Sequence, residues 1–448
     1  MPPSPGHTVN ATYRQVHQIG GDNPPSPGSR QRRGRNEAIL LHHRIGVLVC
    51  EYKDICRELK RRRALHWLSQ AEVQGHMARG TREACLRLPR TSGKVRRMPN
   101  RTMPLRDLKW FTPAIQKVQA EHRARVAALH EGTGRARLVA ITGPMFGRCH
   151  GLGGNNDIDM LKDPDAWLDD VLSDMARQAT LLADRRTFCP PAIEPDALGT
   201  HYLDAIFGAN VFFKEGQVWS EPLDCELTAL APPDLASNRV FQASLELARR
   251  AVRAAREKLL VTTPVLSCPI NIGINLFGER LLAAFIERPA AVSHALRVIT
   301  DLILACCRSF QEIIPVATRR TTVACNRYAP PGHGFIDGCA TQLISARHYR
   351  EFVAPLDNEI LSAKGQRGGM IHLCGSCVQH IPAWRDMEPL RSVQLNDRAT
   401  DDLEHYARGL RPNQVLYVSP TEATPVPRIL SLTRGRRIVL QCPMPERW

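Results

Sequence analysis

Short apolar segments alternate with longer amphipathic segments from Asp107 to the end of this 448-residue chain, and this alternation restricts its fold more than any other feature. The apolar segments have the length of strands buried on both faces, whereas the longer segments repeat apolar residues at helical spacing. Such alternation builds a parallel sheet covered by helices. The eight predicted strands are Leu138–Thr142, Thr187–Ile193, Leu259–Leu266, Gly334–Gly338, Met370–Cys374, Ser392–Leu395, Val415–Val418 and Arg437–Cys442.

Eight strands over residues 108–448 predict an α/β fold of the (β/α)₈ TIM-barrel type. Proline follows the expected helix start at Asp163, Arg288 and Thr424, where a ring-fixed φ suits the first helical turn. An open, doubly wound sheet with a dinucleotide site would need G-x-G-x-x-G after the first strand, but residues 143–147 read GPMFG. The predicted helices cover residues 111–131, 164–184, 236–258, 289–314, 346–363, 399–408 and 425–434.

Residues 1–107 differ from the rest in composition. They contain 21 Lys and Arg against 8 Asp and Glu, whereas residues 108–448 contain 39 against 36. This Pro- and Arg-rich composition disfavours a packed core, so we expect a poorly ordered basic extension. Because the barrel itself is nearly balanced in charge, we expect no nucleic-acid partner for it.

The fourteen cysteines are scattered through predicted strands and helices. A chain of this size needs no disulfides to build a core, so we expect reduced thiols in a cytoplasmic protein. No run of eighteen apolar residues and no secretory signal is found, and we therefore predict no membrane span.

The strongest candidate for chemistry is the segment Gly368–Gly375, which reads GGMIHLCG. Residues two apart on a strand face the same side, so His372 and Cys374 should point together into the mouth of the barrel. Imidazole and thiolate are zinc ligands, and a catalytic zinc usually has three protein ligands. Cys442, at the end of the eighth strand, is the expected third ligand, with Cys377 and Cys339 as alternatives.

Carboxylates also follow several predicted strands. Asp337 and Glu194 have apolar neighbours and lie at strand ends, where a carboxyl group is placed to act as a general acid or base. Asp397 comes directly before a predicted helix, and we expect it to cap that helix.

From about Phe111 to Pro445 the chain resembles the uroporphyrinogen decarboxylase superfamily. The resemblance is carried by Leu161–Trp167 (LKDPDAW), Ala205–Ala209 (AIFGA), Phe285–Pro289 (FIERP), Tyr349–Pro355 (YREFVAP), Ile371–Gly375 (IHLCG) and Leu440–Pro443 (LQCP), in that order. It implies the same barrel. Its zinc-dependent methyltransferase branch holds zinc with a His-x-Cys pair and a later Cys, which correspond here to His372, Cys374 and Cys442. A corrinoid on a separate partner protein is the usual partner in that branch.

The decarboxylase branch implies arginines that bind propionate groups, an essential aspartate and no cofactor. Its Arg-rich motif does not follow the first strand here, where residues 143–150 read GPMFGRCH. The resemblance thus favours a zinc-thiolate methyltransferase that moves a methyl group between a corrinoid or other donor and a small-molecule thiol. The alternatives are a cofactor-free decarboxylase of a porphyrinogen-like or other carboxylated substrate, with Asp337 or Glu194 near the carboxylate and Arg148 or Arg327 close by, and a barrel that binds a ligand without catalysis.

Overall fold

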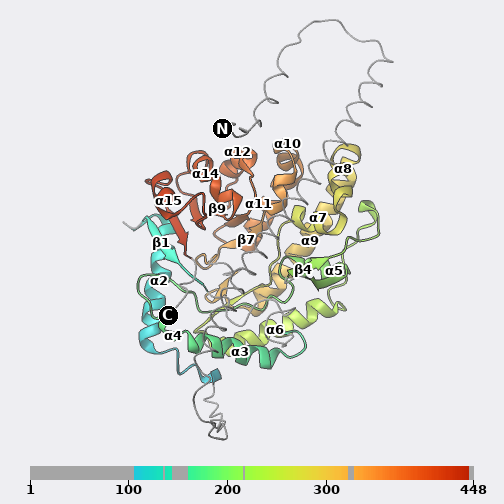
Figure 1. The fold of residues 1–448 in the computed structure, drawn as a ribbon. Helices are drawn as coiled ribbons and strands as arrows, with labels where there is room; N and C mark the ends of the chain where they lie inside the picture. The colour runs from blue at the N-terminus through green and yellow to red at the C-terminus, as the bar shows by residue number, and fades with distance from the viewer. Residues whose placement is uncertain (1–104, 135–136, 144–159, 215–216, 321–326, 443–448) are drawn as a thin grey trace, which may run out of the picture. The chain divides into compact units, whose positions relative to one another are not determined.

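The computed structural model describes residues 105–134, 137–143, 160–214, 217–320 and 327–442 (Figure 1). The chain divides into two units, residues 1–97 and residues 98–448. The predicted basic extension lies almost entirely outside the described residues, as does Arg148 in the segment 144–159. All the described helices and strands belong to the second unit.

All eight predicted strands are present, and all pair in parallel. Six of them form one sheet in the order β1 (Leu138–Ile141), β11 (Ile438–Gln441), β10 (Val415–Val418), β9 (Leu390–Leu395), β8 (Gly369–Leu373) and β7 (Gly334–Asp337). The other two, β2 (Ala192–Ile193) and β5 (Leu260–Thr262), form a second parallel sheet with the unpredicted strand β6 (Arg319–Arg320). An unpredicted antiparallel hairpin joins β3 (Val211–Lys214) and β4 (Gln217–Ser220).

The two sheets meet beside β1. Phe188, just before β2, forms a parallel bridge with Ile141, and its N–H donates to the Ala140 carbonyl at 2.9 Å while its carbonyl accepts from the Thr142 N–H at 2.8 Å. Among the described residues no ladder joins β6 to β7, and residues 321–326 between these strands are not described. The fold is therefore a parallel α/β arrangement that is compatible with the predicted TIM-type barrel, and no ladder closes the barrel among the described residues.

Alternate residues of both sheets face a common interior. One apolar cluster collects side chains from β1, β2, β5, β7, β8, β10 and β11, together with residues of helix α2 (Pro113–Glu131), which lies beside β1 (Figure 1). The intervening strand residues, such as Ile336, Ile371 and Leu416, belong to a second, larger cluster that includes the helices. This division follows from the two-residue period of a strand, and it fixes which residues at the strand ends face inward.

The predicted helices are present, although several of them are broken. They appear as α2, α3 (Pro164–Arg177) with α4 (Ala179–Leu182), α6 (Arg239–Ala255), α9 (Pro289–Ile313), α10 (Ala346–His348) with the π-helical turn η6 (Tyr349–Val353) and α11 (Ala354–Lys364), α13 (Arg398–Asp401) with α14 (Leu403–Gly409), and α15 (Val426–Leu432). Among the described residues, the α-helices that were not predicted are α5 (Tyr202–Ile206), α7 (Pro269–Phe277), α8 (Glu279–Glu287) and α12 (Ile381–Asp386).

Side-chain caps explain several helix starts. Asp163 accepts a hydrogen bond from the Ala166 N–H at 3.1 Å ahead of Pro164, as the sequence predicts. Asn238 caps α6 in the same way through the Phe241 N–H at 3.0 Å. Asp397 stands at the N-cap position of α13 but makes no capping hydrogen bond with its side chain, so the predicted cap is wrong. Its backbone φ of 48° differs from that of an ordinary N-cap.

Helix α9 is long and apolar enough to cross a membrane by length and composition, with a mean hydropathy of 1.6, but 67% of that window is buried inside the protein. It packs against α6, α7, α8 and α11. A helix that is apolar on most of its surface and covered by other helices is a core helix.

Candidate metal centre

Three potential metal ligands converge at the carboxyl ends of β7 and β8. They are Cys339, two residues after the end of β7, His372 on β8, and Cys374 just after β8, and their ligand atoms all lie within 4.8 Å of one another. The local reason is the strand period. Met370 faces the interior cluster, so His372 and Cys374 face the interior too. Phe335 does the same on β7, which directs Asp337 inward, and Cys339 begins the short 3-10 helix Cys339–Leu343 that follows.

The imidazole of His372 is held by a chain of side-chain amides. The strand register places His372 beside Gln394 of β9, and His372 Nδ1 hydrogen bonds with Gln394 Oε1. The Gln394 amide N–H donates in turn to Gln441 Oε1 of β11 at 2.7 Å, and this oxygen also accepts from Ser419 Oγ at 3.0 Å. Because Gln394 presents its oxygen, Nδ1 carries the proton and the lone pair lies on Nε2. Burial, followed by the charge of Arg327, lowers the pKa of His372 well below its usual range, which keeps the ring neutral as a metal ligand must be.

The two thiols are not equivalent. Cys339 and Cys374 share a hydrogen bond that lowers the pKa of Cys374 and raises that of Cys339 well above its usual range. Cys374 is therefore the acceptor and the first of the two to become a thiolate. A thiolate beside a neutral imidazole is a nitrogen–sulfur donor set that suits zinc.

A buried ion pair lies against the same ring. Arg327 Nη1 is 3.5 Å from Asp337 Oδ1, and Arg327 Nη2 is 3.4 Å from His372 Nε2. The pKa of Asp337 is raised because burial outweighs the attraction of Arg327. Asp337 Oδ2 is buried and makes no hydrogen bond within the described residues. The unsatisfied Asp337 oxygen fits a centre that accepts a positive ion. The Arg327 guanidinium, in contrast, faces the Nε2 lone pair in this structure and would have to turn away for a metal to bind there.

The other two cysteines that the sequence offers lie outside this group. On β11, Val439 faces the interior, and Gln441, two residues later, faces the same way. Cys442 is the next residue, so alternation turns its side chain outward, where it packs against the larger core cluster. Cys377 is buried with its sulfur accepting from Thr341 Oγ1 at 3.5 Å, and burial raises its pKa to about 12. In this structure Cys339, which the sequence offers as an alternative ligand, is the third potential ligand beside His372 and Cys374.

Two acidic residues, Glu194 and Asp196, follow β2, and Asp196 is close enough to Asp337 for their charges to interact. Glu194 follows β2 directly and is 5% exposed. Asp196, two residues on, accepts from the Val265 N–H at 3.3 Å, and its pKa is raised to about 7, mainly by burial and further by the charge of Asp337. Asp397 is also close enough to raise the pKa of Cys374. Gln394, Gln441 and Asp397 were not predicted as site residues. Their places near predicted strand ends make them candidates, but which of them meet His372 follows from the strand register.

Comparison with known proteins assigns no family. No family model matches the chain, and no curated protein matches it. Among solved structures, a methyltransferase from Methanosarcina mazei aligns at 13% sequence identity over 72% of this chain and 93% of that chain, with a TM-score of 0.49. Identity at this level assigns no activity, so the function has to be inferred from the residues of the site.

Proposed function

We propose that this chain is an enzyme that holds a zinc ion with Cys339, His372 and Cys374 and transfers a methyl group to a thiol. The observation that carries the proposal is the convergence of these three donors within 4.8 Å at the carboxyl ends of β7 and β8. Barrel enzymes build their active sites at this end of the strands. Three protein ligands leave one position of a tetrahedral zinc open for a substrate.

The protein residues have distinct roles in this proposal. Cys339, His372 and Cys374 hold the metal, and Gln394 fixes the tautomer and orientation of His372. When bound, zinc supplies Lewis acidity that lowers the pKa of a coordinated thiol and keeps it as a thiolate. Asp337, buried beside Arg327, is placed to hold or release the proton that a thiol loses.

The methyl donor and its carrier are inferred from the family resemblance. A corrinoid on a partner protein is the donor that the resemblance implies, with a small-molecule thiol as acceptor and the cytoplasm as the location. The interior of the barrel would keep the thiolate away from water and aimed at the methyl group.

Metal analysis of purified full-length protein tests the proposal. We expect about one zinc ion per chain in the wild type and most of it lost in Cys339→Ser and Cys374→Ser. Cys377→Ser is the matched control, because this thiol lies three residues from Cys374 but outside the group, and it should keep its zinc. Cys442→Ser decides whether the later cysteine is a ligand. A wild type that takes up no zinc, or a Cys374→Ser variant with wild-type zinc content, would contradict the proposal.

A cofactor-free decarboxylase is the second candidate, and the pair formed by Arg327 and Asp337 favours it. A buried arginine next to an aspartate of raised pKa can bind a substrate carboxylate and supply a proton after CO₂ leaves. This candidate predicts CO₂ release from a carboxylated substrate by zinc-free protein. That activity should be lost in Asp337→Asn and retained in Cys374→Ser, which is the opposite of what methyl transfer predicts for the cysteine.

A further inference from the structure

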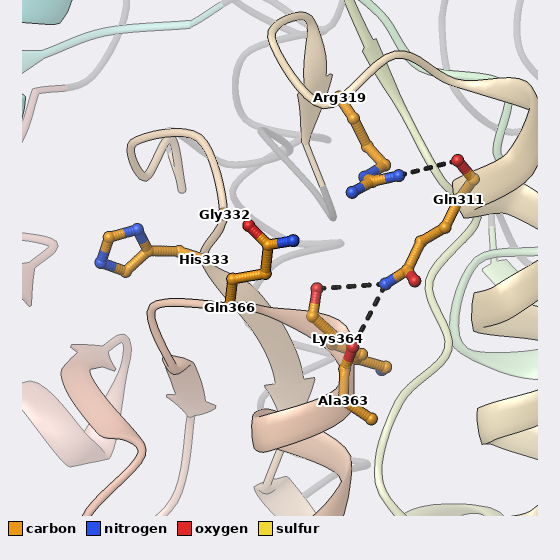
Figure 2. A pocket seen from close by; sticks show the side chains of 7 residues that line it. All are labelled: Gln311, Arg319, Gly332, His333, Ala363, Lys364 and Gln366. Carbon is orange, nitrogen blue, oxygen red and sulfur yellow. Dashed lines mark hydrogen bonds between the residues drawn. The ribbon is translucent and has the colours of Figure 1, made fainter.

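A cavity of about 170 Å³ lies at the other end of the strands from the metal centre. Its lining comes from the start of β6, the segment before β7 and the ends of α9 and α11, and consists of Gln311, Arg319, Gly332, His333, Ala363, Lys364 and Gln366. Because Cys339, His372 and Cys374 lie at the carboxyl ends of their strands, this cavity is a separate site. Figure 2 shows the Arg319 guanidinium and the Gln366 amide directed toward the same open space.

The lining contains the guanidinium of Arg319 and no carboxylate. Arg319 is half-buried, and its Nη1 donates to the backbone carbonyls of Gln311 at 3.0 Å and Ile314 at 3.2 Å. Within the described residues Arg319 makes no ion pair with an acidic group, and burial lowers its pKa. A guanidinium stays charged in proteins, and this one is compensated by carbonyls at the end of α9 but by no carboxylate, so it can also accept an anion from the cavity side.

Two further arginines, Arg367 and Arg391, act on His333, and each is paired with a carboxylate, Glu131 at 3.1 Å and Glu388 at 2.8 Å. After burial, the charges of Arg367 and Arg391 help to lower the pKa of His333 to about 4. Lys364, also in the lining, donates from its ammonium to the buried Phe335 carbonyl at 3.0 Å. The Gln366 side chain is exposed and makes no hydrogen bond among the described residues, so its N–H groups are available to a ligand.

We propose that this cavity binds a small oxyanion, phosphate or the phosphate group of a monoester, between Arg319 and Gln366. The guanidinium supplies charge and paired N–H donors, which suit the oxygens of a phosphate. The Gln366 amide adds a donor from the opposite side. The site is independent of the proposed methyl transfer, and because its occupant binds the folded chain alone, it stabilises the fold by mass action.

Thermal melting and calorimetric titration of the full-length protein with sodium phosphate, at constant ionic strength, test the site. We expect saturable binding and a melting temperature that rises with phosphate concentration. Arg319→Gln should weaken binding about tenfold or more, and Arg308→Gln, an exposed arginine of α9 outside the cavity, should leave it unchanged. A parallel titration with glycerol phosphate distinguishes a monoester ligand, which would bind more tightly, from free phosphate.

Gln366→Glu keeps the test decisive if Arg319→Gln unfolds. Its carboxylate would pair with Arg319 and occupy the place of the anion, so phosphate binding should disappear while the ligand-free protein melts at a higher temperature. Gln379→Glu makes the same charge change outside the cavity and should do neither. Absence of saturable binding up to about 20 mM phosphate, far above typical metabolite affinities, would overturn the proposal. An equal loss in Arg308→Gln would do the same.

Discussion

At the scale of single residues, the site depends on which face of a strand each side chain occupies. The i, i+2 spacing in the sequence predicts that His372 and Cys374 share a face, and the structure confirms it. The contribution of Gln394 could not be predicted, because it follows from the register between β8 and β9 rather than from any local pattern. The sequence could not decide among Cys442, Cys377 and Cys339 as third potential ligand for the same reason, because the choice depends on which strand ends meet. Gln394→Leu keeps the volume but removes the acceptor that orients His372, so zinc affinity should fall about 10- to 100-fold. Competition with a chromophoric chelator measures this affinity, with Gln379→Leu, outside the site, as control. Equal zinc affinity in Gln394→Leu and wild type would show that the amide does not position the ring.

At the scale of elements, the predicted helix over residues 346–363 is broken by the π-helical turn η6. The apolar periodicity did not predict this turn, which contributes to a buried cluster of polar side chains. Tyr349 of this turn donates to Asp357 Oδ2 of α11 at 2.9 Å, and Trp384 of α12 donates to the Tyr349 oxygen at 2.8 Å. Burial raises the pKa of Asp357 to about 7, above the value of about 3.9 for an unfolded chain. The unfolded chain therefore loses this proton first as pH rises, so the contribution of Asp357 to stability is present below about pH 4 and is lost by about pH 7. Asp357→Asn should become more stable than wild type by an amount that grows from pH 5 to pH 8, up to about 4 kcal/mol. Urea denaturation at the two pH values measures this, and Asp386→Asn on the surface of α12 should show no such growth. A difference between Asp357→Asn and wild type that stays constant across this range would mean that Asp357 ionises freely in the folded protein.

At the scale of the whole molecule, the alternation of strands and helices predicted all eight strands, but not how the two sheets are joined. That junction depends on Phe188, which is fully buried, bridges to Ile141 of β1 and packs edge-on against Tyr328 at 4.9 Å between ring centroids. Its side chain belongs to the interior cluster that strands of both sheets share. If this interior makes the sheets one cooperative unit, Phe188→Ala should lower the free energy of unfolding by about 3–5 kcal/mol and leave a single transition. Phe352→Ala removes the same side chain from a half-buried position in η6 and should cost less. Urea unfolding followed by tryptophan fluorescence and by far-ultraviolet circular dichroism tests whether the sheets unfold together. If they form one cooperative unit, the two signals should change at the same urea concentration. Separate transitions, or a loss no larger than that of Phe352→Ala, would mean that the two sheets fold as independent layers and that the mouth holding Cys339, His372 and Cys374 is organised by the six-stranded sheet alone.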